Sequence, residues 1–280
     1  MINKFLKYIY YSIYDVFKIL FNLFLKNNFI IIYPRIASII LNNVKIYDKS
    51  NKKFFNFKVR NYSDILTVYE IFSEENYNLK KYFIFDEINK HYNDNLDNNK
   101  VPIIIDCGSN IGASSVYFSK IFDKSKIALI EPDYESFNFS KKNFSENNFT
   151  FFNFAISNKN DTVKFFSDKR DNRASSVSGS GNITIECHTV DEILRIMDEP
   201  NSVNFLIKID IEGHENKLFE NNYEWLDSFK IVIIEIHDWM LPKKSNSLNF
   251  LSALVSISQN KRKRDLIISG ENLISIRIDE

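Results

Sequence analysis

From about residue 101 onward, short runs of apolar residues alternate with segments whose apolar positions recur every three or four residues. An uninterrupted apolar run is typical of a parallel strand buried on both faces, and the longer period is typical of an amphipathic helix. The predicted strands cover residues 103–105, 127–131, 149–155, 204–209 and 231–236. The predicted helices cover 113–122, 134–146 and 189–197, the last opening with a capping box at Thr189 and Glu192. This alternation predicts an α/β fold with a doubly wound, mostly parallel sheet.

Two further pairs of β-segments are expected. Residues 162–166 and 183–187 predict a local β-pair, separated by a Ser- and Gly-rich loop at 174–182. Residues 265–269 and 273–278, with the turn 270–272 between them, predict a closing antiparallel hairpin. Added to five parallel strands, this hairpin brings the main sheet to seven.

Before residue 101 the pattern is less regular. Residues 54–59 predict a strand and 64–72 a helix, whereas the polar run 93–99 breaks all periodicity and predicts a linker. We therefore expect three segments: an amphipathic helical segment at 1–50, an α+β lead-in with the polar linker at 51–100, and the main domain at 101–280.

The amino-terminal segment is rich in Phe, Tyr, Ile and Leu, but charged residues interrupt it. No uncharged run approaches the roughly 20 residues of a membrane-spanning helix, and a signal peptide is not expected because Lys7 divides the apolar region. Apolar residues at three- and four-residue steps predict an amphipathic helix, with a face formed by Ile9, Ile13, Val16, Leu20 and Leu23. This face could pack on the main domain, on a second subunit of a homo-oligomer, or on a membrane through residues 1–41. The expected location is cytoplasmic, with a peripheral position at the inner membrane face as the alternative.

Composition narrows the functional classes only slightly. The chain has 36 basic and 36 acidic residues, so nothing in its charge indicates nucleic-acid binding. Cys107 and Cys187 are too few for a disulfide framework and lack metal-ligand spacing. Cys107 is expected to be a small packing residue rather than a nucleophile.

The clearest chemical signal is the turn Asp106-x-Gly108-x-Asn110-x-Gly112, which follows the first parallel strand and precedes a helix. Its glycines are expected to let a ligand approach the backbone, and the start of the helix offers N–H groups to an anion. The second strand ends at Glu131, whose carboxylate can accept hydrogen bonds from both hydroxyls of a ribose.

The turn departs from a dinucleotide-binding motif. Such a motif normally reads Gly-x-Gly-x-x-Gly, but Asn110 and Ala113 stand in place of the second and third glycines. Asp106, before the first glycine, suits an amino group better than a pyrophosphate. S-adenosylmethionine carries a ribose, an amino group and a carboxylate without any phosphate, and it is therefore the expected ligand.

A second polar motif lies where a later strand ends. Lys208, Asp210 and Glu212 alternate with isoleucines, so on a strand they would share one face. Unpaired buried charge is costly, so these residues need water, partners or a ligand. The next strand ends in Glu235-x-His237, and the carboxyl ends of parallel strands are where α/β folds place their sites. The alternative is a structural lysine–carboxylate network beside a solvated histidine.

These motifs, in this order, resemble the FkbM-type S-adenosylmethionine-dependent methyltransferases. The resemblance runs from about residue 54 to residue 239 and rests on Asp106–Gly112, Glu131–Pro132, Asn153–Ser157, Thr189–Asp191, Lys208–Glu215 and Glu235–His237. It implies a seven-stranded class I methyltransferase sheet of Rossmann-like type, with S-adenosyl-L-methionine as cofactor. It also implies methyl transfer to oxygen, with a sugar hydroxyl of a surface glycan or a nucleotide-linked sugar as the expected acceptor.

The resemblance also assigns roles to residues. Cofactor contacts would come from Asp106, Gly108, Ser109, Asn110, Gly112, Glu131, Pro132, Ala155 and Asp210. The catalytic, acceptor-facing residues would be Lys208, Asp210, Glu212, His214 and His237. His214 stands where the family often has a small residue. No motif matches the first fifty residues or the segment after Trp239.

The chemistry requires a proton acceptor, because an aliphatic hydroxyl must lose its proton as the new bond forms. A histidine is the natural acceptor near neutral pH, with His237 as first choice and His214 as second.

No resident metal ion is assigned. The alternative is a divalent cation held by Asp210 and Glu212 with Glu235 or Asp238, which would lower the pKa of the hydroxyl. Lys208 argues against this alternative, because its ammonium group could occupy the same position.

Two other classes of function are considered. A nicotinamide-dependent sugar-modifying oxidoreductase would share the early strands and Glu131, but it should have the missing glycines and often a Tyr-x-x-x-Lys pair. A non-catalytic interaction module should have lost pocket residues, yet Asp106, Gly108, Gly112 and Glu131 are all present. The acceptor itself is not encoded in any residue that distinguishes a sugar from a lipid, peptide or polyketide.

Overall fold

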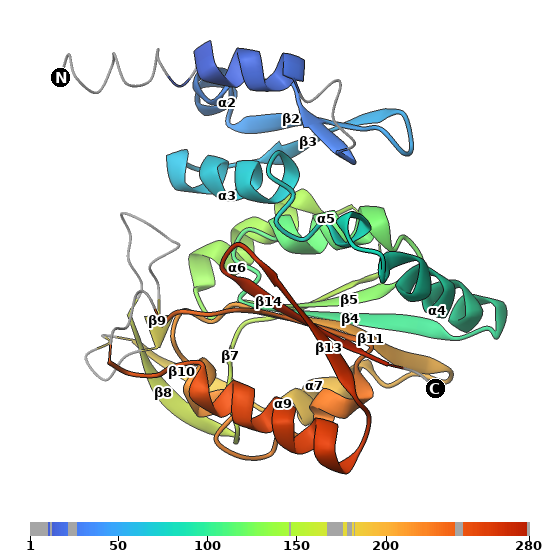
Figure 1. Ribbon diagram of the computed structural model, residues 1–280. Coiled ribbons are helices and arrows are strands. Elements are labelled where there is room, and N and C mark those ends of the chain that lie inside the picture. The colour runs from blue at the N-terminus through green and yellow to red at the C-terminus, as the bar shows by residue number, and fades with distance from the viewer. Residues whose placement is uncertain are drawn as a thin grey trace. The chain divides into compact units, whose positions relative to one another are not determined.

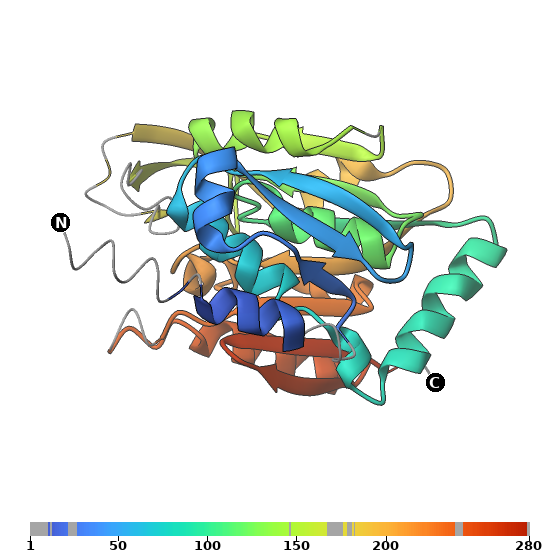
Figure 2. The ribbon, with the colours of Figure 1, turned by 90° about the horizontal axis from the view of Figure 1, so that it is seen from above.

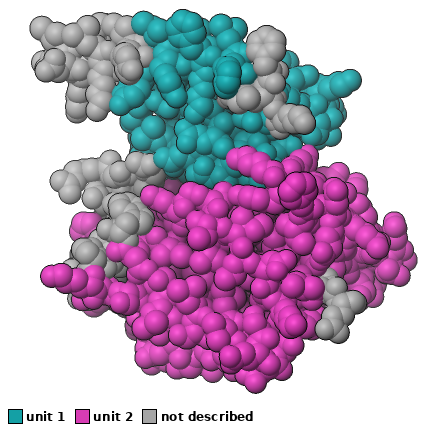
Figure 3. Space-filling model, in the orientation of Figure 1, with its two compact units in different colours: residues 1–78 teal, residues 79–280 magenta. Residues whose placement is uncertain are grey.

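The computed structural model describes residues 11, 13–21, 27–145, 147–166, 176–177, 181, 183–238 and 243–278. The chain forms two compact units, residues 1–78 and residues 79–280, which are coloured separately in Figure 3. The first unit holds a three-stranded sheet, and the second holds one sheet of seven strands and one of four.

The first unit contains a three-stranded antiparallel sheet and helices α2 and α3. Its strands are β1 (Phe29–Ile31), β2 (Asn43–Asp48) and β3 (Lys53–Lys58), in that order. Helix α2 (Arg35–Leu41) connects β1 to β2, and α3 (Tyr62–Phe72) follows β3. The ring of Phe72 packs against Phe29 and Phe55, with centroid distances of 5.1 and 5.8 Å. The strand predicted at 54–59 and the helix predicted at 64–72 are confirmed.

The predicted amino-terminal helix is described over residues 13–21, which are helical. Ile13, Val16 and Leu20 of its predicted apolar face are about half exposed, at 56%, 46% and 52%. The buried side instead carries Asp15, which accepts the backbone N–H of Arg35 and lies 3.6 Å from the guanidinium of that residue. Ile9 and Leu23 lie outside the described residues. Over the part of the chain that the structure describes, none of the helices combines the length and apolar character needed to cross a bilayer.

The second unit is built on a seven-stranded sheet with the order β13-β14-β12-β11-β4-β5-β6. Its strands are β4 (Val101–Cys107), β5 (Lys126–Ile130), β6 (Phe149–Phe152), β11 (Ser202–Ile209), β12 (Ile231–Glu235), β13 (Arg264–Ser269) and β14 (Asn272–Arg277). Strands β6, β5, β4, β11 and β12 run parallel, and β14 is antiparallel to both β12 and β13. The predicted parallel strands and the closing hairpin are confirmed.

Helices cover both faces of this sheet, as Figures 1 and 2 show. On one face lie α4 (Phe85–Asp97), α5 (Ala113–Ile121) and α6 (Tyr134–Ser140), and on the other lie α7 (Val190–Met197) and α9 (Leu248–Asn260). Short helices are η1 (Leu79–Lys81), η2 (Lys141–Asn143), α8 (Glu215–Leu218) and η4 (Glu224–Ser228). Cys107 is a packing residue, as expected: it lies in the core shared with α7 and α9, and burial raises the pKa of its thiol. The doubly wound seven-stranded α/β fold is confirmed.

The chain between β6 and β11 forms a second, smaller sheet of four strands, with the order β7-β10-β8-β9. Its strands are β7 (Ala155–Ile156), β8 (Asp161–Phe166), β9 (Ser176–Val177) and β10 (Ile183–His188). The predicted pairing of β8 with β10 is confirmed and is antiparallel. The strand predicted over 149–155 is divided, because β6 ends at Phe152 and Ala155 pairs instead with Cys187 of β10. Most of the loop 174–182 lies outside the described residues.

Two predicted elements need correction. The polar run 93–99, expected to be a linker, continues helix α4 as far as Asp97. Its buried side is marked only by Ile88, Tyr92 and Asn95, while Asn and Asp occupy the outer face and obscure the helical period. The helix predicted over 134–146 ends at Ser140 and is followed only by the short turn η2.

Candidate active site

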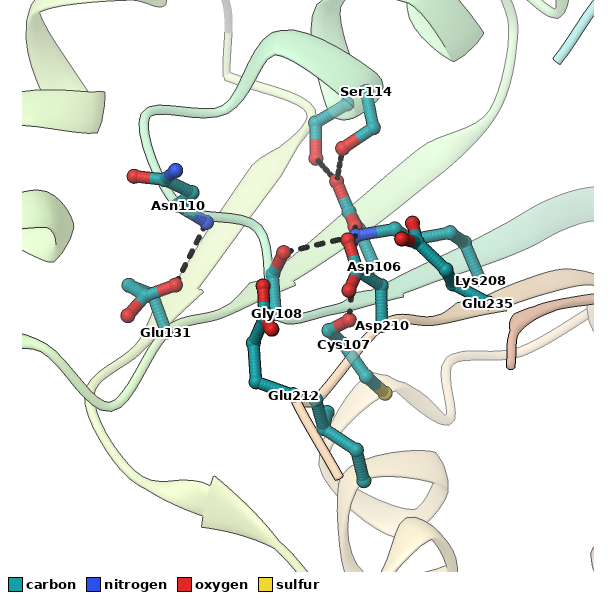
Figure 4. A network of polar contacts seen from close by, with 12 residues as sticks. Asp106, Cys107, Gly108, Asn110, Ser114, Glu131, Lys208, Asp210, Glu212 and Glu235 are labelled. Carbon is teal, nitrogen blue, oxygen red and sulfur yellow. Dashed lines mark hydrogen bonds and ion pairs between the residues drawn. The ribbon is translucent and has the colours of Figure 1, made fainter. Parts of the chain in front are cut away.

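Three neighbouring strands, β4, β11 and β12, end at the same edge of the main sheet. The register places Lys208 of β11 opposite Asp106 of β4 and Ile233 of β12, and Glu235 is the last residue of β12. Because the strands are parallel, the loops that follow them lie side by side. The two polar motifs of the sequence therefore form one site, most of which is drawn in Figure 4.

Gly108 and Gly112 are required by their backbone and by their neighbours. Both have positive φ, +77° and +86°, which L side chains rarely adopt. A Cβ on Gly108 would lie 1.7 Å from the carbonyl oxygen of Asp210, and a Cβ on Gly112 would lie 2.6 Å from the ring of Phe144. The position that a Cβ would take at each of these glycines is therefore filled by the protein itself.

The turn between the glycines is held by the end of β5. The backbone N–H groups of Gly108 and Ser109 both donate to the carbonyl oxygen of Ile130 at 3.0 Å. Asn110, with a φ of 47°, donates its backbone N–H to the carboxylate of Glu131 at 2.7 Å. The hydroxyl of Ser109 is buried and has no hydrogen-bond partner among the described residues.

Glu131 follows β5 and is only 7% exposed. Its carboxylate accepts the backbone N–H groups of Asn110 at 2.7 Å and Asp133 at 2.8 Å. Burial raises the pKa of Glu131 to about 7, although these two N–H groups act to lower it. Asn153 fixes the strand end by donating to the carbonyl oxygens of Glu131 and Pro132, at 2.9 and 3.1 Å. Each carboxylate oxygen can accept a second hydrogen bond, which a ribose hydroxyl could provide.

Asp106 is completely buried at the end of β4. Its Oδ2 accepts the hydroxyl groups of Ser114 and Ser115 of α5, at 2.5 and 2.6 Å, and its Oδ1 lies 3.3 Å from Nζ of Lys208. These contacts tie the strand to the first turn of the helix (Figure 4). The structure thus gives Asp106 contacts within the protein in place of the expected contact with a ligand amino group.

Lys208 is also buried, and its ammonium group links the turn after β4 to the loop after β11. Its Nζ donates to the carbonyl oxygen of Gly108 at 2.9 Å and lies 3.2 Å from Oδ2 of Asp210. It therefore compensates the buried charge of Asp106 and also holds Asp210 in place. This part of the site matches the structural lysine–carboxylate network considered above.

The loop after β11 does not extend the strand as expected. β11 ends at Ile209, and the alternation of side chains is lost because Glu212 adopts a positive φ of 53°. The backbone N–H of Asp210 donates to the carbonyl oxygen of Cys107 at 3.1 Å, which holds the loop against β4. The turn still brings the carboxylates of Asp210 and Glu212 to the same place, beside His237.

His237 is the nearly buried centre of a carboxylate cluster. Its Nδ1 lies 3.0 Å from Oε1 of Glu215, and its Nε2 lies 3.6 to 3.7 Å from one oxygen each of Asp210, Glu212 and Glu235. Burial lowers the pKa of His237, but the hydrogen bond to Glu215 and the neighbouring carboxylate charges outweigh burial and raise the pKa to about 9. A histidine protonated at neutral pH cannot accept a proton, so these surroundings oppose the expected role of His237 as the base.

The carboxylates of this cluster also perturb one another. Burial, followed by the charge of Asp210, raises the pKa of Glu212 to about 8. The charge of Asp210, followed by burial, raises the pKa of Glu235 to about 8. The side chains of all three are 22% to 26% exposed, so a ligand can reach them. The three carboxylates therefore gather at an accessible region, where the repulsion between their charges favours the protonated forms of Glu212 and Glu235.

His214 does not join this cluster. Its Nε2 lies 3.2 Å from the hydroxyl of Ser157, just beyond β7, and burial lowers the pKa of the ring. Its backbone precedes α8, where the carbonyl oxygen of His214 accepts the N–H groups of Lys217 and Leu218 at 3.1 Å. The ring contact with Ser157 removes His214 from the position expected of a second base.

Four residues of the site received no role from the sequence: Ser114, Ser115, Glu215 and Asn246. Glu215 is 1% exposed and, besides His237, binds the backbone N–H of Ile211 at 3.2 Å and the side-chain amide of Asn246 at 2.6 Å. Glu215 is the last residue of the motif that begins at Lys208, so its place in that motif could have indicated a role in the site. Asn246 lies 31 positions further on and had none.

The side chains at this edge fit a nucleoside that carries an amino acid moiety. Glu131 can accept the ribose hydroxyls, and the Ser109 hydroxyl is a buried polar atom without a partner among the described residues. Asp210 is the partly exposed carboxylate next to the turn, which suits an ammonium group, whereas Asp106 is sealed behind it.

The profile of the family described as "Methyltransferase FkbM domain" matches residues 106–261. The matched region contains the whole site, from Asp106 to His237. The chain is also similar to the hexuronic acid methyltransferase AglP of Haloferax volcanii, with 27% identity over 170 residues, which is 59% of this chain and 69% of AglP.

Solved structures of methyltransferases resemble this chain with low TM-scores. The O-methyltransferase from Bacillus cereus in complex with SAH has 12% identity and a TM-score of 0.36, over 63% of this chain and 74% of that one. The N-terminal domain of human METTL16 in complex with SAH has 14% identity and a TM-score of 0.37, over 70% and 68%. The strand order described above identifies the fold.

Proposed function

The chain belongs to the FkbM methyltransferase family and is an S-adenosylmethionine-dependent methyltransferase, and from this premise we propose that it methylates a hydroxyl group of a sugar. The observation that carries the acceptor class is the cluster of accessible carboxylates, Asp210, Glu212 and Glu235. Carboxylates accept hydrogen bonds from hydroxyl groups, which a sugar presents in neighbouring pairs. The name of AglP, a hexuronic acid methyltransferase, supports the same class. We place this sugar in a surface glycan or on a nucleotide.

On the cofactor side, Glu131 would bind the two ribose hydroxyls and Asp210 the amino group. The turn from Gly108 to Gly112, including Ser109 and Asn110, would supply backbone groups beside them. Pro132 and Ala155 complete the proposed contacts. Bound there, S-adenosylmethionine supplies an electrophilic methyl carbon for in-line attack by oxygen.

The protein itself must hold the acceptor hydroxyl in line and take its proton. Glu212 and Glu235 are the proton acceptors that the geometry offers. Each has a pKa of about 8 and accepts the proton only in its ionised form, whose fraction increases as the pH rises toward 8, whereas His237, with a pKa of about 9, is protonated more fully at the same pH. Lys208 and Glu215 act as positioning residues, because Lys208 holds Asp210 and Glu215 holds His237.

The test is formation of S-adenosylhomocysteine by the purified full chain. We would supply S-adenosylmethionine with a panel of oligosaccharides and nucleotide sugars, and detect the methylated product by mass spectrometry. Glu212→Gln or Glu235→Gln should lower turnover by roughly 10² to 10⁴ while leaving S-adenosylhomocysteine affinity unchanged. Glu186→Gln, an exposed matched change on β10, should have no effect. Methylation of only lipid or peptide acceptors would overturn the sugar assignment.

A further inference from the structure

Three side chains near the end of β11 and β12 converge as metal ligands do. One donor atom from each of Asp210, Glu212 and His237 lies within 4.8 Å of the other two. The two carboxylates come from the loop after β11, and the imidazole comes from the loop after β12. Convergence of acidic groups alone would not define a site, so the imidazole is the informative member.

The His237 side chain is 2% exposed, and its Nε2 faces the carboxylates of the cluster. The nearest acceptors, one oxygen each of Asp210, Glu212 and Glu235, lie 3.7, 3.6 and 3.7 Å away, which is too long for a hydrogen bond. Ligands about 2.1 Å from a tetrahedral ion lie about 3.4 Å apart, which is close to these separations. The Nε2 atom of this nearly buried imidazole thus faces carboxylate oxygens at the spacing of ligands that share an ion.

The other ring nitrogen is fixed from behind. Nδ1 of His237 lies 3.0 Å from Glu215, which in turn accepts the side-chain amide of Asn246 and the backbone N–H of Ile211. A carboxylate that accepts Nδ1–H holds the ring orientation, and Nε2 becomes a ligand atom when the incoming ion displaces its proton to solvent, the arrangement found behind most metal-bound histidines.

Lys208 does not occupy the position of a cation in this cluster. Its Nζ lies on the Asp106 side, against the carbonyl oxygen of Gly108, and contacts Oδ2 of Asp210. The oxygen of Asp210 that faces His237 is the other one, Oδ1. The ammonium group of Lys208 therefore leaves the position between Asp210 Oδ1 and His237 to another cation.

We propose that Asp210, Glu212 and His237 bind a divalent transition-metal ion at the acceptor end of the site, with Glu235 as a neighbouring carboxylate. One imidazole and two carboxylates suit Mn²⁺ or Zn²⁺ better than Mg²⁺, which prefers oxygen ligands alone. Three protein ligands leave coordination positions open. Only the role of the ion rests on the proposed function: an acceptor hydroxyl bound there would lose its proton more easily.

The test measures metal binding without cofactor or acceptor. The full chain, freed of metal with a chelator, is titrated with Mn²⁺, and free Mn²⁺ is followed by electron paramagnetic resonance, with Zn²⁺ as competitor. We expect one site per chain. Glu212→Gln should weaken Mn²⁺ binding by about tenfold or more, because a charged ligand is lost, and Glu186→Gln should leave it unchanged.

Glu212 is partly exposed in a loop, so this substitution should preserve the fold, which S-adenosylhomocysteine binding would verify. His237→Gln provides a second variant and should also lose the site. Absence of a stoichiometric Mn²⁺ or Zn²⁺ site, or equal affinity in Glu212→Gln and the unmodified chain, would overturn the proposal. Metal binding without methylation of any sugar would instead count against the proposed function alone.

Discussion

The pKa of Glu131 gives a quantitative test of how the cofactor is bound. Burial raises this pKa to about 7, compared with 4.5 for an ordinary glutamate. If the ionised carboxylate accepts both ribose hydroxyls, bound ligand favours the ionised form, and binding releases the proton that the free protein holds below pH 7. Affinity for S-adenosylhomocysteine should therefore increase with pH.

The magnitude follows from the same value. With a pKa of about 7, roughly one Glu131 in eleven is ionised at pH 6 and roughly ten in eleven at pH 8, so affinity should rise about tenfold over this interval. The free protein should show the opposite sign in stability. Its folded state binds more protons than its unfolded state between pH 4.5 and 7, so the free energy of unfolding should fall across that window, by about 3 kcal/mol at most.

Calorimetric titration at pH 6, 7 and 8, in two buffers with different ionisation enthalpies, measures both affinity and proton release. Glu131→Gln is the matched control, because it keeps the shape and removes the titration. It should bind more weakly at pH 8 and show little pH dependence. An affinity that is flat from pH 6 to 8 in the unmodified protein, or an equal slope in Glu131→Gln, would refute the reasoning.

Three further predictions concern the framework of the site. Gly108→Ala should lower thermal stability and abolish S-adenosylhomocysteine binding, whereas Gly270→Ala, which has a similar positive φ but nothing within 4 Å of its added Cβ, should cost only about 1 kcal/mol. Lys208→Met should cost about 3–5 kcal/mol in denaturant unfolding because it leaves a buried carboxylate uncompensated, and adding Asp106→Asn should restore part of this loss; full additivity of the two changes would contradict the pairing. Glu215→Gln should weaken Mn²⁺ binding by about 10- to 100-fold with unchanged S-adenosylhomocysteine affinity, and unchanged Mn²⁺ affinity would remove Glu215 from the support of the site.

The sequence predicted the main sheet well because each parallel strand is locally encoded as an apolar run. It also placed Asp106 and Glu235 correctly at strand ends, since a strand end is marked by the change from apolar to charged residues. Helix α9 was not anticipated, although Phe250, Ala253 and Ile257 have helical spacing and are buried. The oxidoreductase and non-catalytic alternatives are answered by the family match rather than by any residue.

The contacts of the site could not be predicted, because they join residues far apart in the chain. Position 108 must be a glycine because the carbonyl oxygen of Asp210, about a hundred positions later, lies where a Cβ would be, and no local motif shows this contact. The choice of His237 as a base assumed an ordinary pKa, which depends on carboxylates that only the fold assembles. The site contacts could not be predicted because the residues that make them are far apart in the sequence and because their pKa values depend on charges that only the folded chain brings together.

The position of β14 has a consequence for how the protein is made. β14 lies between β13 and β12, and it pairs with β12 from Ile231 opposite Ile276 to Glu235 opposite Asn272. During translation, the strand that carries Glu235 therefore has an open edge until residue 277 has left the ribosome. An unpaired, apolar strand edge can pair with a strand of another nascent chain. The risk of aggregation is therefore highest during this interval. The first unit, whose strands are neighbours in sequence, can fold long before the catalytic edge is closed.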